Sequence, residues 1–515
     1  MTLPPAAYPY GPFKSLLHSH RLLQSNIASY RQSKLSYCRQ FHSASSLADD
    51  QKQTTKQTPH PSPTTSLPPS AADNATDKAA ESSSQSSNTS LPPSWEDDPN
   101  WNISTFDELP HQKFGWNQHM DTNEEFKLAL RQIIRQFRAP IRYAFAYGSG
   151  VFPQTSSKPT PSSLSPHPHP PDAIVKWQQG GGKMIDFIFG VSFTQHWHSL
   201  NLGEHRDHYS ILGSLGSAFV SQVQDKWGAG VYFNPYVTVN GTLIKYGVVN
   251  LDTIRRDLST WDTLYLAGRL QKPVKIIRDD PNMRLANQIN LISAVRTALL
   301  MLGHQFTETQ LYTAIAGISY MGDPRMRFRT EDPNKVSNIV KNQLPYFRQL
   351  YTPLVQDLPN VSFNDSRCTT DGWMQDPSCN YKLEQDMNPR KRGNMVRRLP
   401  AAFRAKLYFQ YQSKFQIPRK EFDDMLEASK DEDETSFRKR EGSEFDRRIA
   451  AEDDLNEMVG RAIKKTVEWP SVGQTLKGPF TAGLSRSWKY YSEKRAKSKE
   501  VKKEEATGDD VKKKE

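Results

Sequence analysis

The sequence predicts an α/β fold, in which a mixed sheet with flanking helices is followed by a mostly helical domain. Two apolar runs of strand length, residues 141–147 and 184–191, lie among segments with helical apolar spacing. Asn240-Gly241 separates two further runs within residues 232–249, which is the strongest short signal for a two-residue hairpin. After residue 281 the apolar residues recur at helical spacing. Strands and helices therefore come first, and helices follow.

Composition limits how much of the chain can fold. Only 36% of the 515 residues are hydrophobic, and 35 prolines outnumber 27 glycines. Serine, threonine and proline crowd the first hundred residues, which bury too little apolar surface to offset the entropy of ordering them. About four hundred residues remain, which is enough for two packed domains.

Charge and cysteine usage exclude several classes of protein. Cys38, Cys368 and Cys379 are too scattered for a disulfide framework or a CxxC-type zinc site. No window of about 18 apolar residues exists, so the sequence predicts no membrane-spanning helix. The 67 Lys and Arg residues exceed the 56 Asp and Glu residues, and the net charge is +11. This balance favours polyanionic partners: nucleic acid, nucleotides or acidic lipid surfaces.

The N-terminal segment has the composition of a mitochondrial presequence. It carries basic residues but no Asp or Glu before Asp49, and its apolar residues fit one helical face. The run Arg39–Ser43 is similar to a matrix-protease cleavage site. We therefore expect a presequence at residues 1–45, with a merely basic disordered tail as the alternative. A disordered linker rich in Ser, Thr, Pro and Gln is expected at residues 46–100.

The predicted sheet domain covers residues 101–280. A capping box at Thr122–Glu125 begins a helix over residues 126–137. The strand at 141–147 follows, and it ends in the turn Gly148-Ser149-Gly150.

A Pro- and Ser-rich loop insertion at residues 154–182 leads to the strand at 184–191. Apolar spacing then predicts a helix over residues 209–223, before the hairpin. The helical domain is expected at residues 281–460, with helices over 307–317 and 336–350 among others.

The C-terminal region, residues 461–515, has a pattern of its own. Apolar residues recur every four positions from 472 to 488 among basic neighbours, a spacing that could lay an amphipathic segment on an anionic bilayer. Three glycines and a proline between 473 and 483 are expected to interrupt any helix, so an irregular strap docked on the protein's own surface is the alternative. We predict a membrane-associating strap followed by a basic tail.

A candidate nucleotide site follows from two strands. Gly148 and Ser149 place backbone N–H groups and a hydroxyl where a phosphate can approach without a Cβ in its path. Asp186 stands alone among apolar residues of its strand, where a carboxylate is costly unless it meets a cation or a donor. A Gly-Ser turn for a triphosphate and a strand-borne acid for Mg²⁺ are typical of nucleotidyltransferases. A buried aspartate that caps a loop is the alternative.

Three cations are candidate partners of the phosphates. Strand alternation places Lys245 on the face of Leu243 and Gly247, from which it would project towards the triphosphate. The alternative is a lysine that keeps an edge strand soluble. Arg269 and Lys272 are spaced closely enough to bind one phosphate, although surface solvation would also explain them.

The chain also contains a series of ordered blocks that resemble a known family. They are Tyr147–Phe152, Met184–Phe189, Trp197–Ser199, His208–Ser210, Gly228–Asn234, Ile244–Val248, Leu264–Val274, Gly317–Asp323 and Lys477–Gly483. With these blocks the chain resembles the mitochondrial CDP-diacylglycerol synthases. These are peripheral phosphatidate cytidylyltransferases, which are also described as translocator assembly and maintenance proteins.

The resemblance implies a nucleotidyltransferase domain followed by a winged-helix-like helical domain. It also implies a reaction of CTP with phosphatidate that gives CDP-diacylglycerol and pyrophosphate for cardiolipin synthesis, at the matrix face of the mitochondrial inner membrane. In that reaction Asp186 would hold Mg²⁺ or another divalent cation, and Gly148, Ser149 and Lys245 would surround the triphosphate. Arg269 or Lys272 would lie near a phosphate or the lipid headgroup. The expected partners are CTP, phosphatidate and the anionic inner-membrane surface, without nucleic acid.

One departure and two other functions remain open. The wider nucleotidyltransferase superfamily places two acids one residue apart, whereas Phe187 and Ile188 follow Asp186 here. A second metal ligand must come from elsewhere, with Asp252 and Asp257 as candidates, or the metal site differs.

An RNA nucleotidyltransferase would use the same sheet, although the chain lacks an obvious basic and aromatic RNA platform. A non-enzymatic inner-membrane scaffold that supports translocase assembly is the other alternative.

Overall fold

The structure is a computed structural model. It describes residues 95–96, 99–152, 184–327, 331–370, 372–376, 378–429, 441–483, 485–488 and 492, with the side chains of 327 and 426–429 left out. The predicted presequence, the loop at 154–182, nearly all of the linker and the basic tail lie outside the described residues. The described residues belong to one compact unit, which begins at Ser86.

Five strands form the main sheet, in the order β3-β4-β2-β1-β5. β2 and β4 are parallel and the other neighbouring pairs are antiparallel, so the predicted mixed sheet is confirmed. Asn240 and Gly241 join β3 to β4 with φ angles of 45° and 74°, as a type I′ turn requires. The bounds are β1 Tyr143–Tyr147, β2 Ile185–Val191, β3 Val231–Val239, β4 Thr242–Asn250 and β5 Lys275–Arg278.

Helices α2 (Glu124–Arg135) and α4 (Thr194–Glu204) cover one face of this sheet, where Phe187, Phe189 and Tyr246 are buried. The side chain of Asn123 accepts hydrogen bonds from the amides of Glu125 and Phe126, so Asn123 caps α2.

The helix predicted over 209–223 is partly wrong. The 3-10 helix η6 (Ile211–Leu215) comes first, and α5 (Gly216–Lys226) follows it. The spacing analysis also missed α4, because the buried face of α4 combines Trp197 with the polar Thr194, His198 and Asn201.

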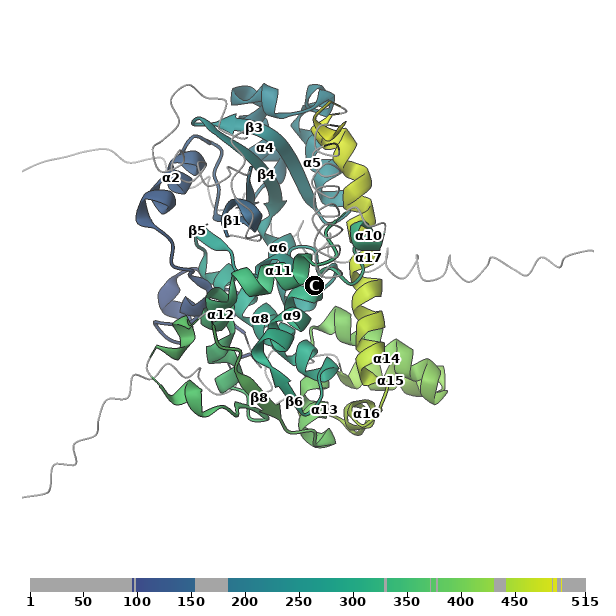
Figure 1. Ribbon diagram of the computed structural model, residues 1–515. Coiled ribbons are helices and arrows are strands. Elements are labelled where there is room, and N and C mark those ends of the chain that lie inside the picture. The colour runs from purple at the N-terminus through teal and green to yellow at the C-terminus, as the bar shows by residue number, and fades with distance from the viewer. Residues whose placement is uncertain are drawn as a thin grey trace, which may run out of the picture. The chain divides into compact units, whose positions relative to one another are not determined.

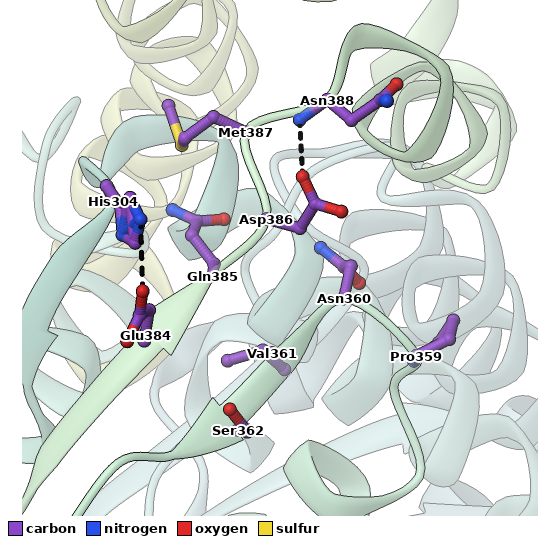
Figure 2. Close-up of a pocket in the computed structure, with 10 residues that line it drawn as sticks. All are labelled: His304, Pro359, Asn360, Val361, Ser362, Glu384, Gln385, Asp386, Met387 and Asn388. Atoms are coloured by element: carbon purple, nitrogen blue, oxygen red, sulfur yellow. Dashed lines mark hydrogen bonds and ion pairs between the residues drawn. The ribbon is translucent and has the colours of Figure 1, made fainter.

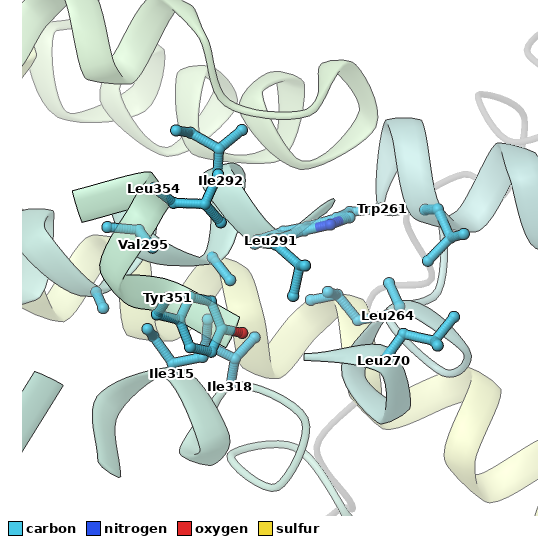
Figure 3. Close-up of a cluster of buried hydrophobic side chains, with 14 of the residues drawn as sticks. Trp261, Leu264, Leu270, Leu291, Ile292, Val295, Ile315, Ile318, Tyr351 and Leu354 are labelled. Carbon is cyan, nitrogen blue, oxygen red and sulfur yellow. The ribbon is translucent and has the colours of Figure 1, made fainter. Parts of the chain in front are cut away.

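The other face of the sheet joins the main core of the molecule. Ile188 and Val249 lie in one buried cluster with residues of α6 (Leu251–Thr260) and α8 (Pro281–Met301). Figure 3 shows the centre of this core, where Leu291, Ile292 and Val295 of α8 lie among apolar side chains from several other helices. The sheet and the helices after it therefore share one core.

The remaining helices follow in chain order. They are α7 Ala267–Leu270, α9 Glu308–Gly317, α10 Pro324–Arg327, α11 Lys335–Asn342, α12 Leu344–Gln356, α13 Pro389–Arg397, α14 Ala401–Phe415, α15 Arg419–Ser429, α16 Glu444–Ala450 and α17 Leu455–Ala482. The helix predicted over 336–350 is divided into α11 and α12, because Pro345 lies in the first turn of a new helix. A small sheet of order β6-β8-β7, with bounds Gln305–Thr307, Lys382–Gln385 and Val361–Phe363, was not predicted.

The last residues of the predicted linker are part of the fold. Trp95 is buried, and its ring meets that of Phe114 at a centroid distance of 5.1 Å. Glu96 forms ion pairs with the buried Arg296, at 2.5 Å, and with Arg398, at 2.9 Å. The expectation of disorder up to residue 100 is therefore wrong for Trp95 and Glu96, because long-range contacts hold these two residues in the fold.

Helix α17 corrects the expectation that glycine and proline would interrupt any helix in this region. It is one helix of 28 residues that includes Pro470 and Pro479, and it packs against α8, α14 and β3 (Figure 1). Gly473 is needed for this packing, because a Cβ there would lie 3.1 Å from the Cα of Gly228. Tertiary contacts therefore override the local signals that disfavour a helix. Within the described part of the chain, no helix is long and apolar enough to cross a bilayer.

Candidate active site

Three predicted site residues meet at the edge of the sheet where β1 ends and β2 and β4 begin. Asp186 is paired in register with Tyr147 on one side and with Lys245 on the other. The Nζ of Lys245 lies 3.2 Å from Oδ1 of Asp186. Oδ2 of Asp186 lies 3.5 Å from the position that a Cβ of Gly148 would take. The carboxylate therefore faces the glycine turn.

The turn itself requires both of its glycines. Gly148–Gly150 form a short 3-10 helix, η3, whose first residue has a φ of +81°. A Cβ on Gly150 would lie 2.6 Å from the carbonyl oxygen of Met184. The turn thus brings the backbone of Gly148 close to the carboxylate of Asp186 without an intervening Cβ, and Ser149 is the next residue of the same turn.

Lys245 lies between a carboxylate and an aromatic ring. Its Nζ is 4.7 Å from the ring centroid of Phe233 on β3, in addition to its contact with Asp186. The side chains of Lys245 and Asp186 are 17% and 24% exposed, so both charges are partly shielded but reachable from solvent. Strand alternation predicted this face for Lys245, and the ion pair lies there.

Arg269 reaches the same corner through Tyr147. Its guanidinium group stacks over the ring of Tyr265 at 3.9 Å and lies 5.6 Å from the ring centroid of Tyr147. The sequence analysis gave Tyr147 no role of its own. Its position directly before Gly148 was the available signal, since the last residue of β1 must lie beside Asp186.

Lys272 follows α7, three residues after Arg269, and contacts Ser319 and Tyr320 of the helical part of the chain. Its ammonium group donates hydrogen bonds to the carbonyl of Gly268 and, at 2.8 Å, to Oγ of Ser319. Burial, together with the nearby charges of Arg269 and Lys335, lowers the pKa of Lys272 to about 7. This pKa places the protonation change of Lys272 near neutral pH.

The two candidates for a second metal ligand have other positions. Asp257 accepts hydrogen bonds from the amides of the loop 263–267, so its carboxylate is structural. Asp252 is 84% exposed, pairs with Arg255, and follows the end of β4, whereas Asp186 lies beside its beginning. Neither joins the corner. Asp186 and substrate phosphates would still fit Mg²⁺, which is often bound by one or two carboxylates and phosphate oxygens.

A pocket of about 590 Å³ lies elsewhere, at the small sheet, and Figure 2 shows its lining. None of the predicted site residues lines it. Its charged groups already have partners: His304 lies 3.1 Å from Glu384, and Asp386 pairs with Lys391 at 2.8 Å and accepts a hydrogen bond from the amide of Asn388. The pocket is therefore separate from the corner of Asp186 and Gly148.

Comparison with known proteins supports a shared chemistry. Residues 130–497, which include the whole corner, match a family described as mitochondrial phosphatidate cytidylyltransferase. Several relatives carry that name, among them the following three. The Schizosaccharomyces pombe protein is 35% identical over 377 residues, which are 73% of this chain and 84% of the relative. The Danio rerio protein is 37% identical over 366 residues, 71% of this chain and 92% of the relative. The Saccharomyces cerevisiae protein is 40% identical over 265 residues, 51% of this chain and 63% of the relative.

Proposed function

The chain belongs to the family of mitochondrial phosphatidate cytidylyltransferases, and from this premise we propose how its own residues act on CTP and phosphatidate. It is a nucleotidyltransferase that makes CDP-diacylglycerol, which decides against the RNA nucleotidyltransferase and the non-enzymatic scaffold. The observation that carries the site assignment is the meeting of Asp186, Lys245 and the Gly148 turn at one edge of the sheet. Incubation of the full chain with labelled CTP, Mg²⁺ and phosphatidate tests the function by the appearance of labelled lipid.

The reaction needs charge neutralisation more than proton transfer. A phosphate oxygen of phosphatidate forms a bond to the α-phosphorus of CTP, and the bond from that phosphorus to the bridging oxygen breaks, which releases pyrophosphate. The attacking phosphate is already anionic at neutral pH, so no general base is needed. The main barrier is the approach of two anions, which cationic side chains and backbone amides lower by offsetting the charge.

The corner supplies groups for this task. Asp186 would hold a divalent cation, which when bound stabilises charge on the transferring phosphoryl group. The amides of the Gly148 turn, the hydroxyl of Ser149 and the ammonium group of Lys245 would contact the triphosphate. Lys245 pairs with Asp186 at 3.2 Å. A triphosphate whose cation is held by Asp186 would therefore lie within reach of the Lys245 ammonium group.

Lys272 gives the reaction a predicted pH dependence. With a pKa of about 7, Lys272 is charged below neutral pH and attracts a phosphate there, and this attraction fades as the pH rises. We expect Lys272→Met to raise the KM for phosphatidate about 10-fold at about pH 6.5 and to change it little at about pH 8.5. The ratio of variant to wild-type KM removes the titration of the substrate itself. A ratio that stays constant over this range would contradict the assignment.

We propose that the protein associates peripherally with the inner membrane at its matrix face. The support for association with a membrane is an exposed apolar surface. It consists of Trp469, Leu476 and Phe480 on α17 with Ile211 and Leu215 on η6 and Trp227, each at least 51% exposed. The rings of Trp227 and Phe480 are 6.4 Å apart, and Ser210 donates a hydrogen bond to the carbonyl of Phe480, which joins η6 to α17. We name these six residues the apolar surface.

The basic neighbours in the C-terminal region have a different role from the one that the amphipathic pattern suggested. Lys477 is buried and donates to the carbonyls of Gln224 and Trp227 at the end of α5. Arg486 donates to the carbonyls of Asp207 and His208. Lys477 and Arg486 therefore attach the C-terminal region to the sheet domain. Among the described residues, the apolar side chains are the groups that we propose contact the membrane.

Serine substitution of the α17 part of the apolar surface tests this role. We expect the triple variant Trp469→Ser, Leu476→Ser, Phe480→Ser to lower the partition into vesicles containing cardiolipin at least about 10-fold, since each inserted side chain contributes about 1.5–3 kcal/mol. Sedimentation with vesicles measures it. Leu128→Ser on α2, which is also an exposed apolar position, is the control and should bind like wild type. Equal sedimentation of the triple variant and wild type would refute the proposal.

A further inference from the structure

The block Gly317–Asp323 lies directly against α7, although the reaction described above gives it no role. A Cβ on Gly268 would lie 2.3 Å from Cβ of Ser319, so the two segments touch with no room for a side chain. Oγ of Ser319 accepts the hydrogen bond from Lys272 at 2.8 Å. Gly268 and Ser319 together therefore fix the position of the Lys272 ammonium group.

Four cations gather around this contact. The ring centroid of Tyr320 lies 5.2 Å from Nζ of Lys272 and 5.8 Å from Nζ of Lys335. Arg269 and Arg325 complete the group, since each is close enough to influence a neighbouring charge.

Two carboxylates offset part of this charge. Asp323 pairs with Arg325 at 2.6 Å, and Glu331 pairs with Lys335 at 2.6 Å. Among the described residues, these two carboxylates pair with Arg325 and Lys335 and not with Arg269 or Lys272.

These two cations lack a carboxylate partner in the part of the chain that the structure describes. The hydrogen bonds of Lys272 go to a carbonyl and a hydroxyl. Nε of Arg269 is buried and has no hydrogen-bond partner among the same residues. Cations shielded from water in this way are costly unless an anion joins them. Arg269 together with protonated Lys272 would offset the charge of a phosphate monoester, which carries about 1.5–2 negative charges near neutral pH.

We propose that Arg269 and Lys272 bind the phosphate monoester of the acceptor substrate, and that Ser319, Tyr320 and Lys335 are positioning residues that hold Lys272 for it. This assignment rests on the proposed function, which requires an acceptor phosphate next to the α-phosphate of CTP. Tyr147 connects the two locations, because it lies beside Asp186 and under Arg269. The helical part of the chain thereby contributes to acceptor binding, and the corner of Asp186 and Lys245 serves the nucleotide.

Steady-state kinetics with the full chain and a short-chain, soluble phosphatidate tests the proposal, because the KM for phosphatidate and the KM for CTP are measured separately. We expect Ser319→Ala and Lys335→Met each to raise the KM for this phosphatidate about 5–10-fold, with kcat and the KM for CTP within about twofold of wild type. Lys341→Met, at an exposed position on the same helix as Lys335, is the matched control and should leave all three constants unchanged. A parallel rise in the KM for CTP, or no change in either KM, would overturn the proposal.

Direct binding keeps this inference separate from the proposed function. Calorimetric titration of the wild-type chain with sn-glycerol 3-phosphate and with inorganic phosphate needs no turnover. We expect the monoester to bind more tightly than inorganic phosphate and Lys335→Met to weaken the monoester about 5-fold or more. Preference for inorganic phosphate, or binding that Lys335→Met does not alter, would refute the acceptor site. Absence of labelled lipid together with intact monoester binding would instead refute the proposed reaction.

Discussion

Replacement of Asp186 by asparagine should lower the rate of cytidylyl transfer by about 1,000-fold or more, which corresponds to about 4 kcal/mol of lost transition-state stabilisation. Asparagine keeps the shape of the side chain but removes the negative charge that would hold the divalent cation. The same change should cost little stability, about 1 kcal/mol or less, because the ion pair with Lys245 is partly exposed. The assay is the transfer of label from CTP to phosphatidate, and thermal unfolding checks the fold.

Asp252→Asn is the matched control for this variant. Asp252 is an exposed carboxylate that the sequence also offered as a metal ligand. It pairs with Arg255 and follows the end of β4, away from Asp186. We expect this control to keep activity within about twofold of wild type. A folded Asp186→Asn protein with more than about a tenth of wild-type activity would show that the carboxylate is not essential, and the assignment of the corner would fail.

Asp257→Ala should be among the most destabilising single changes in the sheet domain, at about 3–5 kcal/mol. The buried carboxylate of Asp257 accepts hydrogen bonds from the amides of Thr263, Leu264, Leu266 and Ala267 and from the hydroxyl of Thr263. Its removal leaves four amides without an acceptor. The free energy of unfolding in urea measures the loss.

The same experiment distinguishes a structural Asp257 from a metal ligand. A metal ligand would affect activity and leave the apoprotein nearly as stable as wild type. Asp257→Asn keeps one acceptor oxygen, so we expect a smaller loss of about 1–3 kcal/mol and a folded protein in which activity can be measured. Stability equal to that of wild type in both variants would contradict the structural role. Since the loop 263–267 leads into α7, the variants should also displace Arg269 and raise the KM for phosphatidate.

The sequence predicts the corner well because its signals are local. The glycine turn after β1, the lone acid in β2 and the alternation that places Lys245 depend on neighbours within a few residues, and the sheet brings them together as expected. The candidates for a second ligand failed for a geometric reason. β2 and β4 are parallel, so Asp186 lies beside the beginning of β4, whereas Asp252 follows its end.

Contacts between distant segments were beyond the reach of sequence patterns. Ser319 meets Lys272 from 47 positions away, and Gln474 binds the carbonyl of Val231 from 243 positions away. No spacing rule describes such pairs. The strands of the small sheet have only three or four residues, too few to show a period of two.

The unbroken course of α17 has a mechanical consequence. Its first half lies in the core through Val459 and Ile463, and its second half is attached to the sheet domain through Gly473 and Lys477. The outward side of the same rod carries Leu476 and Phe480. If Leu476 and Phe480 insert into a bilayer, the rigid helix therefore holds the folded part of the enzyme at one angle to the membrane surface. The distance from the lipid headgroups to the carboxylate of Asp186 is then fixed by the fold and does not vary as it would on a flexible tether.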